Sequence, residues 1–145
     1  MAMSDPPNSG PSVRGSRILL VDDDPMILRA MRRLLLTARP GWEIDMAESA
    51  AAASALLEAK SYDVVVTDLQ MPVVGGALLL ERLKAEQPSV MRVIHSSHVE
   101  AFGSQGLDSL AHAAVNKLGR TDELVLVLDW ALDQRRRRLR DSVGY

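Results

Sequence analysis

Short apolar runs alternate with longer amphipathic stretches along the chain, and this alternation limits the possible folds more than any other feature of the sequence. The apolar runs have the length of strands, and several contain consecutive β-branched residues, which favours strands that are buried on both faces. The predicted strands are Ile18–Val21, Trp42–Ala47, Asp63–Thr67, Met91–Ile94 and Ala113–Val115. Strands that alternate with helices form a parallel sheet with helices on both faces. We therefore predict an α/β fold with a five-stranded, doubly wound parallel sheet in a three-layer sandwich.

A helix is expected after each strand. Asp24 followed by Pro25 is a typical helix start, because an aspartate caps the free N–H groups and proline fits the first helical position. Pro40 and Gly41 end this helix. The other predicted helices are Ser49–Ala59, Ala77–Glu86, Val99–Leu110 and Thr121–Arg138. Ser49 is the candidate cap of the first of these. Gly103 and Gly106 weaken the fourth of these five helices.

The composition of the two ends suggests where the folded domain stops. Residues 1–16 are rich in proline, glycine and serine and lack an apolar segment, so we predict a flexible N-terminal tail rather than a signal peptide. Residues 17–134 form the predicted domain, and residues 135–145 are a basic end or linker. We interpret the arginines at 135–138 as solvated cations that oppose the helix dipole, with contact to an acidic partner or lipid as the alternative.

Charge and cysteine content exclude several functions. A net charge of −2 gives no basic field for nucleic acid. The chain has no cysteine, which excludes disulfides and thiolate metal sites and fits a reducing compartment such as the cytoplasm. No apolar run approaches the roughly 20 residues that a membrane-spanning helix requires.

Polar side chains follow four of the five predicted strands. They are the aspartates at 22–24, then Asp68, then the serines at 96–97, then Lys117. The carboxyl ends of parallel strands meet at one sheet edge, where such folds bind ligands. Clustered carboxylates raise each other's pKa unless a cation lies among them, and oxygen ligands without cysteine suit Mg²⁺. A carboxylate can also accept a phosphoryl group, provided that a metal, a lysine and a hydroxyl neutralise the charge. We assign Asp24 to helix capping.

The segments Ile18–Pro25 (ILLVDDDP) and Asp63–Pro72 (DVVVTDLQMP), followed by Lys117, resemble the receiver domain of response regulators. The separations fit as well, with 45 residues from Asp23 to Asp68 and 49 from Asp68 to Lys117. The resemblance extends over residues 17–134. It implies a flavodoxin-like fold and a switch that is phosphorylated by a histidine kinase or a histidine phosphotransfer protein. Its output would be a phosphorylation-dependent interaction between proteins.

The resemblance also implies a role for each site residue. Asp68 would be the phosphoacceptor, and Mg²⁺ would be held by Asp68, by Asp23 directly, by Asp22 partly through water, and by the backbone carbonyl of Gln70. Ser96 would bind a phosphoryl oxygen, with Ser97 as the alternative if the alignment shifts by one. Lys117 would pair with the phosphoryl group. Beyond self-catalysed transfer and autodephosphorylation, no enzymatic activity is expected.

Two hypotheses compete with a phosphorylated switch. One is a receiver-like scaffold that carries no phosphate. The other is an aspartate-dependent phosphatase of the haloacid-dehalogenase type, which is disfavoured because Met26 stands where that class needs a hydroxyl or valine. Whether the chain is a stand-alone receiver or part of a longer regulator is open, since no output domain follows Tyr145.

The chain departs from the family pattern after the fifth strand and within it. Leu118 follows Lys117 where the family has a proline, often in the cis form, so we expect a trans bond. Ala114 replaces the usual aromatic residue, so a different output route is expected. The last helix is apolar nearly all the way round at Leu124, Val125, Leu126, Val127, Leu128, Trp130, Ala131 and Leu132. We predict self-association or partner binding through this helix.

The three histidines are not expected to bind metal. His95 and His98 have no third ligand at a suitable spacing, and each is interpreted as a surface or hydrogen-bonding residue, as is His112. His98 lies two residues past Ser96, a position that in the resembling family influences hydrolysis of the acyl phosphate.

Overall fold

The computed structural model describes residues 15–71, 75–98 and 106–143, and these contain a single five-stranded sheet. The strands are β1 (Arg17–Val21), β2 (Glu43–Ala47), β3 (Val64–Thr67), β4 (Met91–Ser96) and β5 (Ala113–Asn116). Their order across the sheet is β2-β1-β3-β4-β5, and every neighbouring pair is parallel. The predicted five-stranded parallel sheet is therefore confirmed, with strand ends within two residues of the predicted ones.

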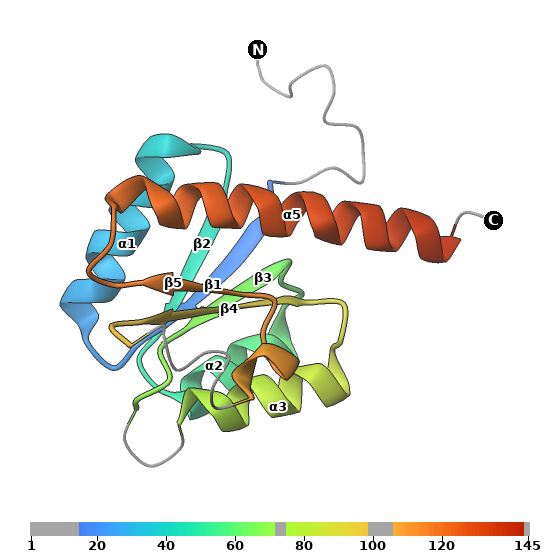
Figure 1. Cartoon of the computed structure of the whole chain (residues 1–145), viewed down its shortest axis with the longest axis horizontal. Helices are drawn as coiled ribbons and strands as arrows, with labels where there is room; N and C mark the ends of the chain where they lie inside the picture. Colours follow the sequence, from blue (N-terminus) through green and yellow to red (C-terminus); the bar gives the residue numbers. More distant parts are fainter. Residues whose placement is uncertain (1–14, 72–74, 99–105, 144–145) are drawn as a thin grey trace.

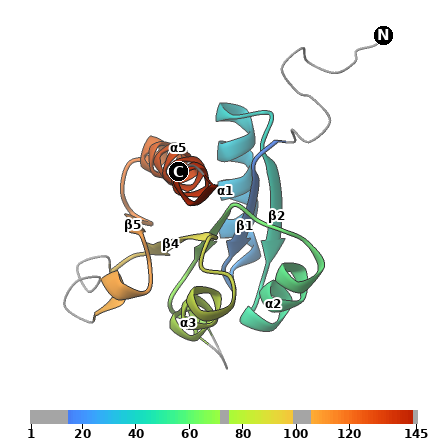
Figure 2. The same cartoon turned by 90° about the vertical axis from the view of Figure 1, so that its right-hand side faces the viewer.

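Helices cover both faces of the sheet, as Figures 1 and 2 show. One face carries α1 (Pro25–Ala38) and α5 (Thr121–Val143), and the other carries α2 (Ala50–Ala59) and α3 (Gly76–Glu86). Alternate residues of β1 enter the two cores: Ile18 packs on the α1 and α5 side, and Leu19 packs on the α2 and α3 side. Because both faces of β1 are buried from Ile18 to Val21, its sequence is continuously apolar over these residues, and the three-layer sandwich is confirmed.

The predicted helix caps are present. An Asp24 carboxylate oxygen accepts a hydrogen bond from the Met26 N–H at 2.9 Å, and the Ser49 hydroxyl accepts one from the Ala52 N–H at 3.0 Å. Helix α1 stops at Ala38, just before the Pro40–Gly41 pair that predicted its end. Each cap satisfies N–H groups that the first turn of a helix leaves free.

The helix predicted over Val99–Leu110 is only partly open to comparison, because residues 99–105 lie outside the described residues. The remainder forms no α-helix but a short 3₁₀ turn, η1, at Leu107–Ser109. Gly106 precedes it with φ at 72°, a left-handed conformation that glycine adopts without strain. The C-terminal part of that predicted helix is thus wrong, since Gly106 redirects the backbone.

Helix α5 continues to Val143, so the predicted end at Arg138 is wrong and the arginine run lies inside the helix. Figure 1 shows its last turns extending past the sheet. Arg135 is not solvated as predicted, because its guanidinium pairs with the Asp63 carboxylate at 2.9 Å. Although α5 has 23 residues, no described helix is long and apolar enough to cross a membrane.

Candidate functional site

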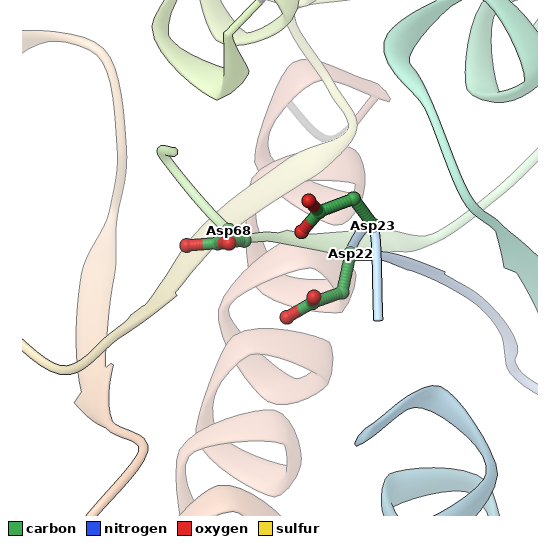
Figure 3. Close-up of side chains that lie close together, drawn as sticks. All are labelled: Asp22, Asp23 and Asp68. Atoms are coloured by element: carbon green, nitrogen blue, oxygen red, sulfur yellow. The ribbon is translucent and has the colours of Figure 1, made fainter. Parts of the chain in front are cut away.

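The structure brings the strand-end aspartates together at the carboxyl edge of the sheet. Asp22 and Asp23 follow β1, and Asp68 follows β3. Each offers a carboxylate oxygen, and these oxygens lie within 4.8 Å of one another. Figure 3 shows the three side chains gathered at this edge. Asp22 and Asp68 are buried, whereas Asp23 is exposed to solvent. The acidic cluster predicted from the sequence is therefore present.

Lys117, the residue after β5, reaches into this cluster. Its Nζ atom lies 2.8 Å from an Asp22 carboxylate oxygen and 3.2 Å from an Asp68 carboxylate oxygen. Burial by itself lowers the pKa of Lys117, but the hydrogen bond to Asp22 and the charges of Asp68 and Asp22 outweigh it and raise that pKa. The three carboxylates of the cluster and the one ammonium that pairs with Asp22 and Asp68 leave an excess of two negative charges, which is a suitable environment for a divalent cation.

Backbone N–H groups hold the two buried carboxylates in place. The second carboxylate oxygen of Asp22 accepts a hydrogen bond from the Asp24 N–H at 2.9 Å. The second oxygen of Asp68 accepts one from the Gln70 N–H at 3.3 Å. Gln70 therefore lies beside the cluster, while the ligand role of its carbonyl stays a prediction. Each buried carboxylate is fixed on one side by the backbone and faces Lys117 with its other oxygen.

Gly76, the first residue of α3, is a site residue that the sequence analysis missed. A methyl group added at Gly76 would lie 2.0 Å from the Asp68 carbonyl oxygen, so only glycine fits against the backbone of the aspartate. The Gly76 N–H also donates to the Leu69 carbonyl at 3.1 Å. The signal was the Gly75–Gly76 pair at the start of a predicted helix, where glycine is otherwise unfavourable.

The two candidate serines differ in orientation. Ser96 ends β4 and is only 4% exposed, and its hydroxyl accepts a hydrogen bond from the His98 N–H at 3.1 Å. Ser97 is exposed, and its hydroxyl lies 3.2 Å from the Nδ1 atom of His98. The Lys117 N–H donates to the Ser96 carbonyl at 2.9 Å, which joins the ends of β4 and β5. Ser96 is thus the serine anchored beside the lysine.

The Lys117–Leu118 peptide bond is trans, as are all peptide bonds in the described ranges. Asn116 holds the turn that a proline would otherwise define. Its side-chain oxygen accepts a hydrogen bond from the Leu118 N–H at 2.8 Å, and its carbonyl accepts one from Gly119 at 3.1 Å. The Leu118 side chain itself is 82% exposed. Asn116 was missed because only the lysine and the residue after it were considered.

His95 is buried, contrary to the predicted surface or hydrogen-bonding position. Its Nδ1 atom has no hydrogen-bond partner in the part of the chain that the structure describes. Together with Lys117 it lines a cavity of about 310 Å³ between α1, β5 and the start of α5. Burial, reinforced by the charge of Lys117 and opposed by that of Asp22, lowers the pKa of His95 to about 4. A neutral imidazole therefore lies next to the acidic cluster.

Comparisons with known proteins agree with this geometry. The family model described as "Response regulator receiver domain" matches residues 18–129. The transcriptional regulatory protein GlrR of Escherichia coli is 32% identical over 128 residues, which are 85% of this chain but only 28% of GlrR. The CheY-like receiver domain protein of Methanospirillum hungatei superposes with a TM-score of 0.77 at 25% identity, over 86% of this chain and 98% of that one. The response regulator TrrA of Thermotoga maritima, solved in complex with Mg²⁺-BeF, gives a TM-score of 0.72 at 26% identity, over 81% and 99% of the two chains.

Proposed function

This chain belongs to the response regulator receiver domain family, and we propose from this premise that Asp68 accepts a phosphoryl group in a Mg²⁺-dependent reaction. The observation that carries the proposal is a cluster of three carboxylates at the end of the sheet, two of which, Asp22 and Asp68, pair with the Lys117 ammonium. The donor would be a phosphohistidine of a histidine kinase or histidine phosphotransfer protein in the cytoplasm. In the transfer, the donor's N–P bond breaks and an O–P bond to Asp68 forms.

The residues present fit a hard divalent cation. Asp22, Asp23 and Asp68 supply oxygen donors without competing nitrogen or sulfur ligands, and the Gln70 carbonyl is the fourth proposed protein ligand. When bound, Mg²⁺ would neutralise charge on the phosphoryl oxygens. The exposure of Asp23 leaves the cluster open to solvent on one side, where phosphate and water would complete the metal shell.

Lys117 and Ser96 would stabilise the phosphorylated state. The Lys117 ammonium lies 3.2 Å from an Asp68 oxygen, within reach of a phosphoryl group on that residue. The Ser96 hydroxyl has a donor proton to offer, because among the described residues it acts as an acceptor for the His98 N–H alone. Turning this hydroxyl toward a phosphoryl oxygen would shift the segment that follows β4 and so signal the modification.

The output surface would be α5, where the apolar residues exceed what the core covers. Leu128 and Ala131 are fully buried, whereas Leu126 is 59% and Trp130 is 44% exposed. These two exposed residues lie one helical turn apart and form one stripe. We propose that this stripe mediates self-association or binds a downstream protein. Light scattering with and without beryllofluoride tests self-association: a Leu126→Glu change should abolish it, and a monomer in both states would contradict self-association and leave partner binding as the role of the stripe.

A receiver-like scaffold that carries no phosphate is the alternative that an experiment must distinguish from a phosphorylated receiver. An aspartate-dependent phosphatase has no support, because the family match is to receiver domains. The test is incubation with a small phosphodonor, with and without Mg²⁺, followed by intact-protein mass spectrometry. We expect a gain of one phosphoryl group only with Mg²⁺. Asp68→Asn should abolish the gain and the capping variant Asp24→Asn should keep it. No gain in the wild type would favour the scaffold. The chain spans only 28% of the length of GlrR. The alternatives of a stand-alone receiver and a receiver within a longer regulator are therefore both kept in this proposal.

A further inference from the structure

A cluster of basic side chains lies at the sheet edge opposite Asp68. It consists of Arg92 near the start of β4, His112 just before β5, and Arg138 on α5. Arg92 is only 6% exposed, yet within the described residues no carboxylate pairs with it or with Arg138. Its guanidinium donates instead to the carbonyls of Leu110 at 2.7 Å, Val90 at 3.1 Å and Pro88 at 3.3 Å. A buried cation without a counter-ion is costly unless an anion joins it.

Hydrogen bonding fixes where the His112 proton lies. The Arg92 backbone N–H donates to His112 Nδ1 at 2.9 Å, so Nδ1 is an acceptor and carries no proton. A neutral imidazole with an accepting Nδ1 carries its proton on Nε2. Burial, with the charges of Arg92 and Arg138, lowers the pKa of His112 to about 4, so the ring is neutral at physiological pH. Nε2 is therefore a donor.

Two guanidinium nitrogens then lie next to a third donor, His112 Nε2, and the described residues place no acceptor between them. The Arg138 guanidinium lies 3.0 Å from His112 Nε2, and a terminal nitrogen of Arg92 lies 3.5 Å from the same atom. Neither guanidinium can donate to a nitrogen that itself carries a proton. A single anionic oxygen, by contrast, could accept from all three groups, and hydrogen bonds to charged groups of this kind are strong.

We propose that Arg92, His112 and Arg138 form a binding site for one oxyanion, either a phosphate group or a carboxylate. The site is independent of phosphorylation at Asp68, because it lies at the amino ends of β4 and β5. Arg92 and His112 come from the sheet edge, and Arg138 comes from the exposed side of α5 and completes the site. The oxyanion would replace the missing counter-ion of the buried Arg92.

Nitrogen-15 NMR of the His112 side chain is the test, with inorganic phosphate, acetate and chloride titrated at matched ionic strength. We expect a saturable shift of Nε2 with phosphate and none with chloride. A saturable shift with acetate at higher affinity than with phosphate would identify a carboxylate, such as an acidic side chain of a partner, as the oxyanion that the site prefers. A linear response to all three ions would overturn the proposal. So would a spectrum that places the proton on Nδ1, because Arg138 would then donate directly to Nε2.

The matched variants are Arg138→Gln and Arg136→Gln, which remove the same charge from exposed positions of the same helix. Loss of Arg138 should weaken anion binding by at least about tenfold, the effect of one charged hydrogen bond. Loss of Arg136 should leave the affinity unchanged. Equal weakening in both variants would show a general effect of basic charge and would overturn the site.

Discussion

Lys117 and Asp22 form a buried ion pair in which Nζ and a carboxylate oxygen lie 2.8 Å apart, and the Asp22 side chain is only 2% exposed. The same ammonium lies 3.2 Å from Asp68. Removing one partner of a buried pair leaves the other charge uncompensated, which costs more than the pair contributes. The stability of the domain and the chemistry proposed for Asp68 thus depend on the same lysine.

We predict that Lys117→Met lowers the free energy of unfolding by about 3 kcal/mol in Mg²⁺-free buffer, because two buried carboxylates lose their cation. Mg²⁺ should restore part of this loss by supplying positive charge at the same place. The control is Lys60→Met, which removes a surface ion pair with Asp45 and should cost about 1 kcal/mol or less. Urea denaturation with and without Mg²⁺ measures both. Equal losses in the two variants would contradict the role of Lys117.

Gly76→Ala should displace the backbone that carries the phosphoacceptor. The added methyl group would meet the Asp68 carbonyl oxygen at 2.0 Å, so the expected cost is about 1–3 kcal/mol of stability, together with slower phosphorylation. Gly41→Ala is the matched control, since nothing lies within 4 Å of a methyl group there. Thermal unfolding and the rate of reaction with a small phosphodonor are the measurements. Wild-type behaviour of Gly76→Ala would show that this contact is unimportant.

Arg135 should contribute more to stability than its neighbours in the arginine run. Its guanidinium lies 2.9 Å from the carboxylate of Asp63, the residue just before β3, and both side chains are largely buried, with 21% and 14% exposed. Arg135→Gln should cost about 1–2 kcal/mol, whereas Arg136→Gln at an exposed position should change stability by no more than about 0.5 kcal/mol. Urea denaturation of the two variants at equal pH compares them, and indistinguishable midpoints would refute the anchoring role.

His95 should make the domain sensitive to acid. Its pKa is lowered to about 4 in the folded state, mainly by burial, from an ordinary value near 6.5. Between these values the unfolded chain binds a proton that the folded chain does not, so stability falls as the pH decreases from about 6.5 to about 4. The slope that His95 adds is at most about 1.4 kcal/mol per pH unit. His95→Leu should flatten the pH dependence of urea denaturation between pH 7 and pH 5, and an unchanged slope would contradict the assignment.

The sequence was sufficient to predict the sheet, because β1 and β3 contain buried apolar runs and the first two helices begin with clear caps at Asp24 and Ser49. It was also sufficient for the acidic cluster, since parallel strands bring Asp22 and Asp68 to one edge regardless of side-chain detail. Contacts that depend on close packing were not predictable. The fit of Gly76 against Asp68 and the turn held by Asn116 arise from backbone approach, which periodicity does not encode.

The helix ends and the basic positions were predicted least well. Arg135 was expected in solvent because a run of arginines resembles a solvated end, yet one of the four lies over Asp63 where α5 crosses the sheet. His95 was expected to be a surface or hydrogen-bonding residue, but strand alternation places it under α1 and α5, as its cavity neighbours show. In both cases the tertiary arrangement decided the environment, and local composition did not.

The most direct test of the central claim is to locate the phosphoryl group after reaction with a small phosphodonor and Mg²⁺. Borohydride converts an aspartyl phosphate to homoserine, and peptide mass spectrometry then identifies the modified position. The account predicts homoserine at Asp68 alone, and no modification when Mg²⁺ is omitted. Modification of Asp22 or Asp23 in place of Asp68, or equal modification without the metal, would contradict it.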